Sequence, residues 1–258
     1  MKYLVAAYTE SGKRPMNQDA YCVRKASTSF GEILMAVLCD GMGGADLGER
    51  ASEETTQAFS CWFREVLPGL LGSMDGVFQR DLILQSWTTL LKQENEKLIR
   101  EGNRFQKTMG TTTSVLLLVD GEACLIHVGD SRIYHMSRKN IVQMSVDHSV
   151  VGQEVREGKI TEEQARRDPP RNQLMQCVGI RGEIHPQCAG WTYRKGDRFL
   201  LTSDGFVHEN TPEEICRLTD GWSSRQETGM EKKLEKLTCK AMEAGESDNI
   251  TSVLIRVR

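Results

Sequence analysis

The chain has 258 residues, of which 39% are hydrophobic and 27% charged, and its formal net charge is −3. A weakly acidic chain carries no basic field for a nucleic-acid backbone, so we expect no nucleic-acid partner. The longest apolar runs are far shorter than a bilayer span, and the amino terminus lacks the apolar region of a signal peptide. We therefore expect a cytoplasmic protein with no membrane attachment.

The first third of the chain predicts three strands and two long helices. Residues 3–9 and 20–26 alternate like strands and flank a loop rich in charges and amides. An apolar run at 33–39 reads as a buried strand that ends in Asp40 and a glycine-rich turn, DGMGG, at 40–44. Apolar side chains then recur at helical spacing, first from Leu47 to Val66 and again from about Met74 to about Arg100.

The middle of the chain changes to short strands. Residues 111–120, 123–128, 131–136 and 140–144 are joined by turn residues and predict an antiparallel meander. A polar, charged segment follows up to about Leu174. It contains two short helical patterns, and we expect a loop region that faces a ligand.

The last third returns to strands at 188–193 and 197–203. Thr211, Pro212 and Glu214 form a capping-box signature for a short helix, a longer helix follows, and the final strand is 250–257. No linker or repeat interrupts the chain, so we predict one domain. Helices with a single apolar face, together with two batches of strands, predict an α+β fold with four layers, α/β/β/α, in which helices flank two stacked antiparallel sheets.

Cysteine and histidine do not suggest another class of protein. The eight cysteines are scattered singly, without a C-x-x-C pair, and the five histidines form no H-E-x-x-H pattern. Buried free thiols are the usual interpretation of such cysteines. We predict neither a disulfide framework nor a zinc site.

Five acids stand at predicted strand ends, each beside small or amide residues: Asp19, Asp40, Asp130, Asp204 and Asp248. A turn or cap role is the commoner explanation for any one of them. If the strand ends lie together, however, the acids make an oxygen-lined pocket that needs positive charge. Mg²⁺ and Mn²⁺ are the ions that such sites select.

A series of short motifs supports the hypothesis of a metal site, because together they resemble those of a known family. In their order along the chain, they resemble the signatures of the metal-dependent type 2C protein serine/threonine phosphatases, the PPM family, in its bacterial single-domain form. The motifs are Arg14, Asn17-Gln18-Asp19, the run at 40–44 with Gly48-Glu49 and Ala51-Ser52, 109–112, 128–134, 147–149, 158–161, Arg171-Asn172, Gly196-Asp197, 203–205 and 247–251.

The resemblance implies a metal site with two ions, Mn²⁺ or Mg²⁺. Asp40 would bridge them, with the backbone carbonyl of Gly41 as a further ligand. Asp204 and Asp248 would hold the first ion together with Asp40, and Asp19 would support the second, largely through waters. Asp130, with Asp204, would bind a third ion.

The catalytic residues implied are Asp40 and Arg14. Arg14 matches the residue that grips the substrate phosphate, which suits the forked donors of a guanidinium; a surface salt bridge is the alternative. Met42 stands where many eukaryotic relatives carry a histidine that can protonate the leaving group. We therefore expect the proton from a metal-bound water, at the third site.

The implied activity is hydrolysis of phosphoserine and phosphothreonine in proteins, by attack of a metal-bridging hydroxide on phosphorus. The resemblance implies a single catalytic domain over 1–258, with a flap at about 149–174 that influences substrate choice. We expect a monomer that opposes a bacterial Ser/Thr kinase. The alternative is a catalytically silent, metal-binding regulator that docks phosphoproteins. A nucleotide loop at 41–44 is disfavoured because neither G-x-G-x-x-G nor a P-loop pattern occurs there.

Overall fold

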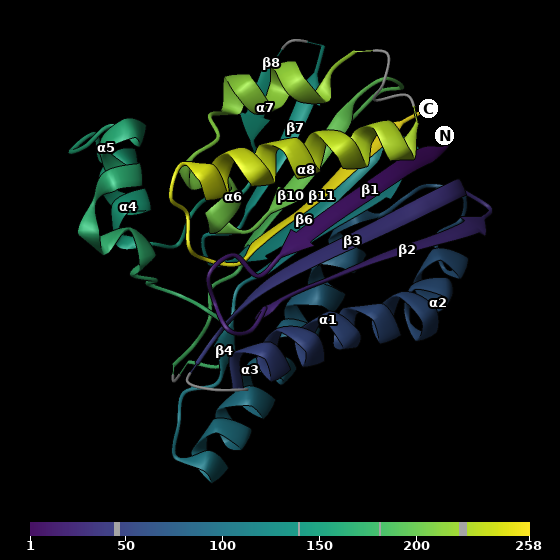
Figure 1. Ribbon diagram of the computed structural model, residues 1–258. Coiled ribbons are helices and arrows are strands. Elements are labelled where there is room, and N and C mark those ends of the chain that lie inside the picture. Colours follow the sequence, from purple (N-terminus) through teal and green to yellow (C-terminus); the bar gives the residue numbers. More distant parts are fainter. Residues whose placement is uncertain (44–46, 139, 181, 222–225) are drawn as a thin grey trace.

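The computed structural model describes residues 1–43, 47–138, 140–180, 182–221 and 226–258. Within these residues the strands form two stacked antiparallel sheets (Figure 1). The first sheet has the order β1 (Tyr3–Glu10), β11 (Ile250–Val257), β10 (Arg198–Thr202), β7 (Arg132–Ser137) and β8 (Asn140–Gln143). The second has the order β2 (Asp19–Thr28), β3 (Gly31–Met42), β5 (Thr113–Val119), β6 (Glu122–Val128) and β9 (Gln187–Thr192), and β4 (Gly110–Thr111) pairs with the end of β3.

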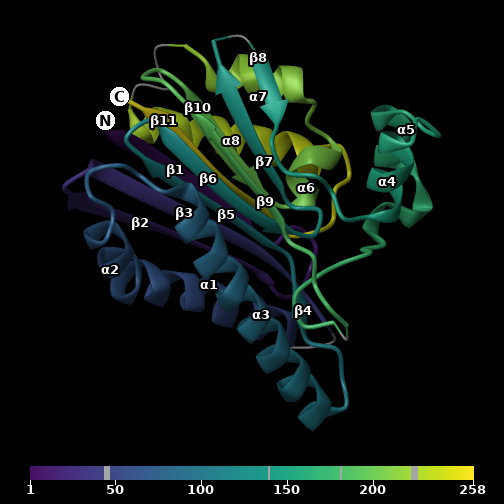
Figure 2. The same ribbon diagram turned by 180° about the vertical axis from the view of Figure 1, so that it is seen from behind.

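Helices cover the outer face of each sheet (Figures 1 and 2). The second sheet carries α1 (Leu47–Glu65), α2 (Leu67–Gly72) and α3 (Arg80–Phe105). The first carries α6 (Asp204–His208), α7 (Pro212–Thr219) and α8 (Glu227–Glu243). The predicted order of layers, α/β/β/α, is confirmed. Three short helices, α4 (Val150–Arg156), α5 (Glu162–Arg167) and the 3-10 turn η1 (Pro169–Asn172), lie to one side of the sandwich.

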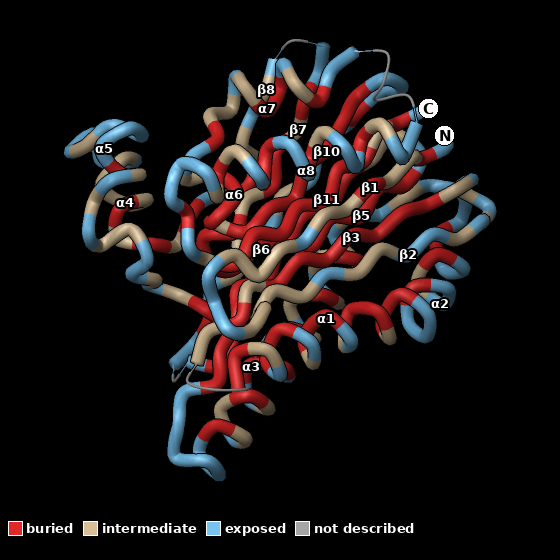
Figure 3. The backbone as a smooth tube through the Cα atoms, in the orientation of Figure 1, coloured by how far each residue is buried: buried red, intermediate tan, exposed pale blue. Residues whose placement is uncertain are grey.

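Strand β3 shows why the sequence has a continuous apolar run in an antiparallel sheet. Ile33, Met35 and Val37 point to the core beneath α1 and α3, whereas Leu34 and Ala36 point to the core between the two sheets. Both faces of this strand are therefore buried, as Figure 3 shows for the centre of the sandwich. A strand covered on both sides loses the usual alternation of apolar and polar residues.

The predicted meander is wrong at one point. Strands β5 and β6 pair within the second sheet, but β7 and β8 belong to the first. The chain changes sheets at Gly129–Ser131, between β6 and β7. Periodicity could not reveal this change, since a strand looks the same whichever sheet receives it. The crossing places Asp130 between the two sheets.

Several helix boundaries also differ from the predictions. Helix α3 begins at Arg80, later than about Met74, and continues to Phe105. Neither α2, with Pro68 in its first turn, nor α6 was predicted. The sequence of α6 begins with Asp204-Gly205, which reads as a turn. Gly44, the last glycine of the predicted turn, lies outside the described residues.

The strand registers gather the functional loops at one end of the sandwich. Asp19 pairs with Asp40 across β2 and β3, so the start of one strand lies beside the end of the other. In the first sheet, the end of β10 lies between the start of β11 and the start of β7. None of the helices in the described ranges combines the length and the apolar composition that a membrane crossing requires.

Candidate functional site

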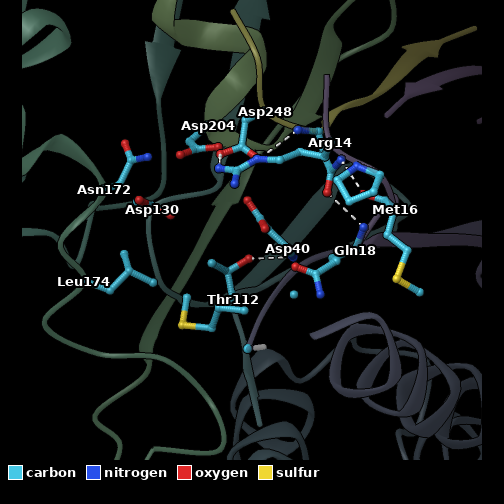
Figure 4. Close-up of a pocket in the computed structure, with 15 residues that line it drawn as sticks. Arg14, Met16, Gln18, Asp40, Thr112, Asp130, Asn172, Leu174, Asp204 and Asp248 are labelled. Carbon is cyan, nitrogen blue, oxygen red and sulfur yellow. Dashed lines mark hydrogen bonds and ion pairs between the residues drawn. The ribbon is translucent and has the colours of Figure 1, made fainter. Parts of the chain in front are cut away.

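A cavity of about 420 Å³ opens at this end of the sandwich (Figure 4). Most of the acids predicted for the site line it, and they come from loops and strand ends far apart in the sequence. Figure 4 shows their carboxylates directed toward the same space as the Arg14 guanidinium. The predicted residues in its wall are Arg14, Asp40, Gly41, Asp130, Asp204 and Asp248, joined by Met16, Met42, Asn172 and Leu174 among others.

Asp19 is the predicted site residue that does not line this cavity. It lies beside Asp40 across the β2–β3 register and lines a second groove, between β2 and α1. Its Oδ2 accepts a hydrogen bond from the Ser203 hydroxyl at 2.9 Å. Its buried Oδ1 has no hydrogen-bond donor among the described residues. An unpartnered carboxylate oxygen is costly to bury, so this atom is suited to a water or a cation.

The backbone around Asp40 is fixed by threonines that the sequence did not single out as functional. The Asp40 N–H donates to Thr112 Oγ1 at 2.9 Å, and the Thr112 N–H donates to the Asp40 carbonyl at 2.8 Å. Gly41 is required beside them, because a Cβ there would lie 2.1 Å from the Gly48 carbonyl oxygen. The strand end is therefore rigid where it presents the carboxylate.

Asp130 is placed by the crossing between the sheets. Gly129 has φ +115°, and a Cβ there would lie 2.6 Å from the Thr112 side chain. Only glycine adopts this conformation readily and fits this contact. The Gly129 N–H donates to His148 Nδ1 at 3.2 Å, so His148 anchors the segment that leads to α4. His148 is not among the residues that line the cavity.

The acids raise one another's pKa values. Burial, and then the negative charges of its neighbours with Asp19 first, raise the pKa of Asp40 well above its usual range, although the side chain keeps access to the cavity. Burial and the charge of Asp204 raise the pKa of Asp130 in the same way. Burial raises the pKa of Asp19 to about 7, partly offset by the neighbouring hydroxyls of Thr251 and Ser203. The negative charge of such a cluster exceeds the positive charge around it.

Arg14 contributes positive charge to this cluster through its ion pair with Asp248. Its Nε donates to Asp248 Oδ1 at 3.0 Å and its Nη2 to Asp248 Oδ2 at 2.8 Å. Among the described residues, no three His, Cys, Asp or Glu side chains are drawn together tightly enough to share one ion. The donor set nevertheless fits a hard divalent cation, since it is all oxygen and excess negative. Each Asp248 oxygen accepts one hydrogen bond from Arg14, and Oδ2 keeps a lone pair that a cation can use.

Two further buried residues lie behind the acids and were missed by the sequence reasoning. The His208 Nδ1 and Glu246 Oε2 atoms are 2.8 Å apart. Burial opposes the charge of Glu246, but hydrogen bonds from His208 and from two backbone N–H groups lower its pKa to about 2. His208 and Glu246 are 38 positions apart. Since neither belongs to a motif, no local pattern indicated that they meet.

The raised pKa values predict how the stability of the metal-free protein depends on pH. An acid whose pKa is higher in the folded than in the unfolded state stabilises the fold below its unfolded value, and this contribution is lost as pH rises. For Asp19 the window runs from about pH 4 to about pH 7. We expect the melting temperature in EDTA to fall across this window, and to fall less in Asp19→Asn. Equal pH dependence in both proteins would contradict the assignment.

Comparison with known proteins agrees with this fold. The family model described as protein phosphatase 2C matches residues 10–238. Protein phosphatase PhpP of Streptococcus pneumoniae is 31% identical over 256 residues, which cover 97% of this chain and 96% of the relative. The structure of serine/threonine phosphatase Stp1 from Staphylococcus aureus is 26% identical, with a TM-score of 0.83 over 100% of this chain and 96% of that one.

A third relative was solved with metal. The catalytic domain of the serine/threonine protein phosphatase PstP, in complex with two manganese ions, is 25% identical, with a TM-score of 0.77 over 99% of both chains. The family model spans most of the chain, and the identity to PhpP extends over nearly all of it. The chain therefore belongs to the protein phosphatase 2C family and is a serine/threonine protein phosphatase.

Proposed function

We propose that the chain hydrolyses phosphoserine and phosphothreonine in proteins at the cavity bounded by Asp40 and Arg14. The observation that carries this proposal is the convergence of acids from separate segments on one cavity that also contains a guanidinium. Carboxylates suit a divalent cation, and the guanidinium suits a phosphate. A phosphate monoester needs both partners, because its charge must be neutralised before a nucleophile can approach.

The proposed metal ligands are those implied by the sequence: Asp40 with the Gly41 carbonyl, Asp204, Asp248, and Asp19 through waters. Two Mn²⁺ or Mg²⁺ ions are proposed, as in the manganese complex of PstP. When bound, such ions supply a hydroxide nucleophile by lowering the pKa of a bridging water, and they neutralise the phosphoryl oxygens. Asp130 and Asp204 are proposed for a third ion.

The protein's own groups position the substrate. The guanidinium of Arg14 would move from Asp248 to two oxygens of the phosphate, which it can bind with parallel hydrogen bonds. Asp40 stays fixed by its hydrogen bonds to Thr112, so the attacking side of the site is preorganised. No covalent phosphoenzyme is required, and the cysteines have no catalytic role.

Met42 lines the cavity and cannot donate a proton to the leaving group. We propose that the proton arrives on the Asp130 side of the cavity. We expect Asp130→Asn to reduce turnover of a phosphothreonine peptide by about 100-fold, a typical loss for general acid catalysis. Turnover of p-nitrophenyl phosphate should change much less, because its leaving group departs without a proton. Equal losses for both substrates would contradict this role.

We propose that residues 1–258 form a single catalytic domain with a flap at about 149–174. The flap comprises α4, α5 and η1, and its ends are joined by a bridge between Ser149 and Leu174. Asn172 and Leu174 reach the cavity from it. Exchange of the flap for that of PhpP should shift the preference among phosphopeptides. An unchanged order of kcat/KM values would argue against a role in specificity.

Manganese-dependent hydrolysis of p-nitrophenyl phosphate tests the proposed function. We expect activity with Mn²⁺, none in EDTA, and none in Asp40→Ala or Asp204→Ala. A wild-type protein that binds Mn²⁺ and a phosphopeptide without turnover would instead support the silent regulator. The opposing kinase, the monomeric state and the location in the cytoplasm stay predictions from the sequence.

A further inference from the structure

Behind the wall of the cavity lies a buried pair, His208 and Glu246, which we call the His208–Glu246 clamp. The side chain of His208 is 10% exposed and that of Glu246 is 4% exposed. His208 ends α6, the helix that begins with Asp204, and Glu246 precedes Asp248 by two residues. The clamp therefore joins the two segments that carry Asp204 and Asp248.

Glu246 uses both carboxylate oxygens in this arrangement. Its Oε2 accepts from His208 Nδ1 at 2.8 Å. Its Oε1 accepts from the backbone N–H groups of Ser247 at 2.6 Å and Asp248 at 2.9 Å. One side chain thus fixes the plane of the imidazole and the backbone of the loop. Charge-assisted hydrogen bonds of this kind are among the stronger ones in proteins.

The fixed ring directs its other nitrogen at Asp204. His208 Nε2 lies 3.8 Å from Asp204 Oδ2, which is within ion-pair range but longer than a hydrogen bond. Asp204 has two oxygens, so one can face the cavity while the other faces the ring. Burial lowers the pKa of His208, but Glu246 and Asp204 raise it above its usual value against the positive charge of Arg171, from η1.

Helix α6 needs outside support to hold Asp204 still. It has five residues, and its N-cap, Ser203, makes no side-chain capping bond. So short a helix is not stable by itself. Gly205, directly after Asp204, packs against the backbone of Asn249, because a Cβ at this position would lie 2.5 Å from the Asn249 carbonyl oxygen. The His208–Glu246 clamp adds a second contact, which joins the C-terminal end of α6 to the loop that carries Asp248.

We propose that His208 and Glu246 are positioning residues that orient the Asp204 carboxylate, relative to Asp248, for a divalent cation. This inference rests on the proposed function, because it assumes that both acids are metal ligands. Residues outside the ligand set that hold the orientation of a ligating group typically contribute a factor of about 10–100 to metal affinity.

A purely electrostatic role of His208 predicts the opposite change in Mn²⁺ affinity. If the imidazole acted only as a positive charge near the cavity, its removal would strengthen the binding of a cation. If it orients Asp204, its removal weakens that binding. The direction of change in Mn²⁺ affinity therefore separates positioning from simple charge.

Calorimetric titration of the purified full chain with Mn²⁺, without substrate, tests the proposal. We expect His208→Ala and Glu246→Gln to weaken Mn²⁺ binding by about 10-fold or more. His208→Gln keeps a donor near the position of Nε2 and should recover most of the affinity. His208→Asn keeps a donor only near Nδ1, toward Glu246, and should not. Recovery by glutamine but not asparagine is a result that mere loss of packing would not produce.

His135→Ala is the matched control. His135 Nε2 pairs with Asp197 Oδ2 at 2.9 Å, with both side chains mostly buried, at the opposite end of the first sheet. Its removal should lower the melting temperature and leave Mn²⁺ affinity unchanged. If His208→Ala does not fold, the glutamine and asparagine variants carry the comparison.

Unchanged or tighter Mn²⁺ binding in the His208 variants would overturn the inference and leave the proposed function intact. Absence of Mn²⁺ binding by the wild-type chain would overturn both, so the two failures are distinguishable.

Discussion

Asp40→Asn is expected to abolish phosphatase activity and at the same time to stabilise the metal-free protein. The loss should be at least about 1,000-fold in kcat with Mn²⁺, because several kcal/mol of charge stabilisation in the transition state depend on the ions. The gain in stability follows from the cluster of acids, whose mutual repulsion falls when one becomes a neutral amide. A gain of about 1 kcal/mol would raise the melting temperature by about 2–4 °C.

Thermal melts with EDTA and with Mn²⁺, beside steady-state kinetics, measure both effects. The wild type should be stabilised by Mn²⁺, and the variant should lose most of that shift, since only a bound ligand stabilises by mass action. Asp75→Asn removes one negative charge from an exposed position and serves as control. A variant that keeps its activity, or that melts lower than wild type in EDTA, would contradict the placement of Asp40 in a repulsive metal-binding cluster.

Arg14→Ala is expected to lower kcat/KM for a phosphothreonine peptide by about 100-fold, mainly through KM. Hydrogen bonds to a charged group are each worth about 1.5–3 kcal/mol, and the guanidinium can supply two in parallel. Arg14→Lys should recover part of the loss, because it keeps the charge but not the fork. Mn²⁺ affinity should not fall in Arg14→Ala, since Asp248 is then released from its pair with Arg14.

The neighbouring Lys13 provides the control for this experiment. Lys13→Ala removes the same charge one residue away, and it should change kcat/KM by less than about threefold at physiological salt, where exposed charges are screened. Equal losses in both variants would mean that the loop acts through its general positive field. A loss in Arg14→Ala confined to kcat would mean that the guanidinium does not bind the ground-state phosphate.

Much of the fold could be predicted from sequence because local patterns record burial. The apolar run at 33–39 predicted β3, and the Thr211 capping box is present at the start of α7. Amphipathic spacing predicted α1, most of α3 and α8. These features depend on neighbours within a few residues along the chain, which is why periodicity detects them.

Features that depend on residues distant in the sequence could not be predicted from local sequence patterns. The change of sheets at Gly129 depends on which sheet has room for β7, and α6 depends on support from the loop that carries Asp248. The pairing of His208 with Glu246 spans 38 residues and carries no motif. Each is a long-range contact whose local sequence is compatible with an ordinary turn or helix end.

The sequence by itself determined the class of protein, the layers, and the five acids that stand at strand ends. Only the tertiary structure decided that Asp40, Asp130, Asp204 and Asp248 line one cavity, while Asp19 lies beside Asp40 and lines a second groove. It also decided that Arg14 pairs with Asp248. The physical reason is that charge repulsion, burial and ion pairing depend on distance in space, whereas periodicity measures only distance along the chain.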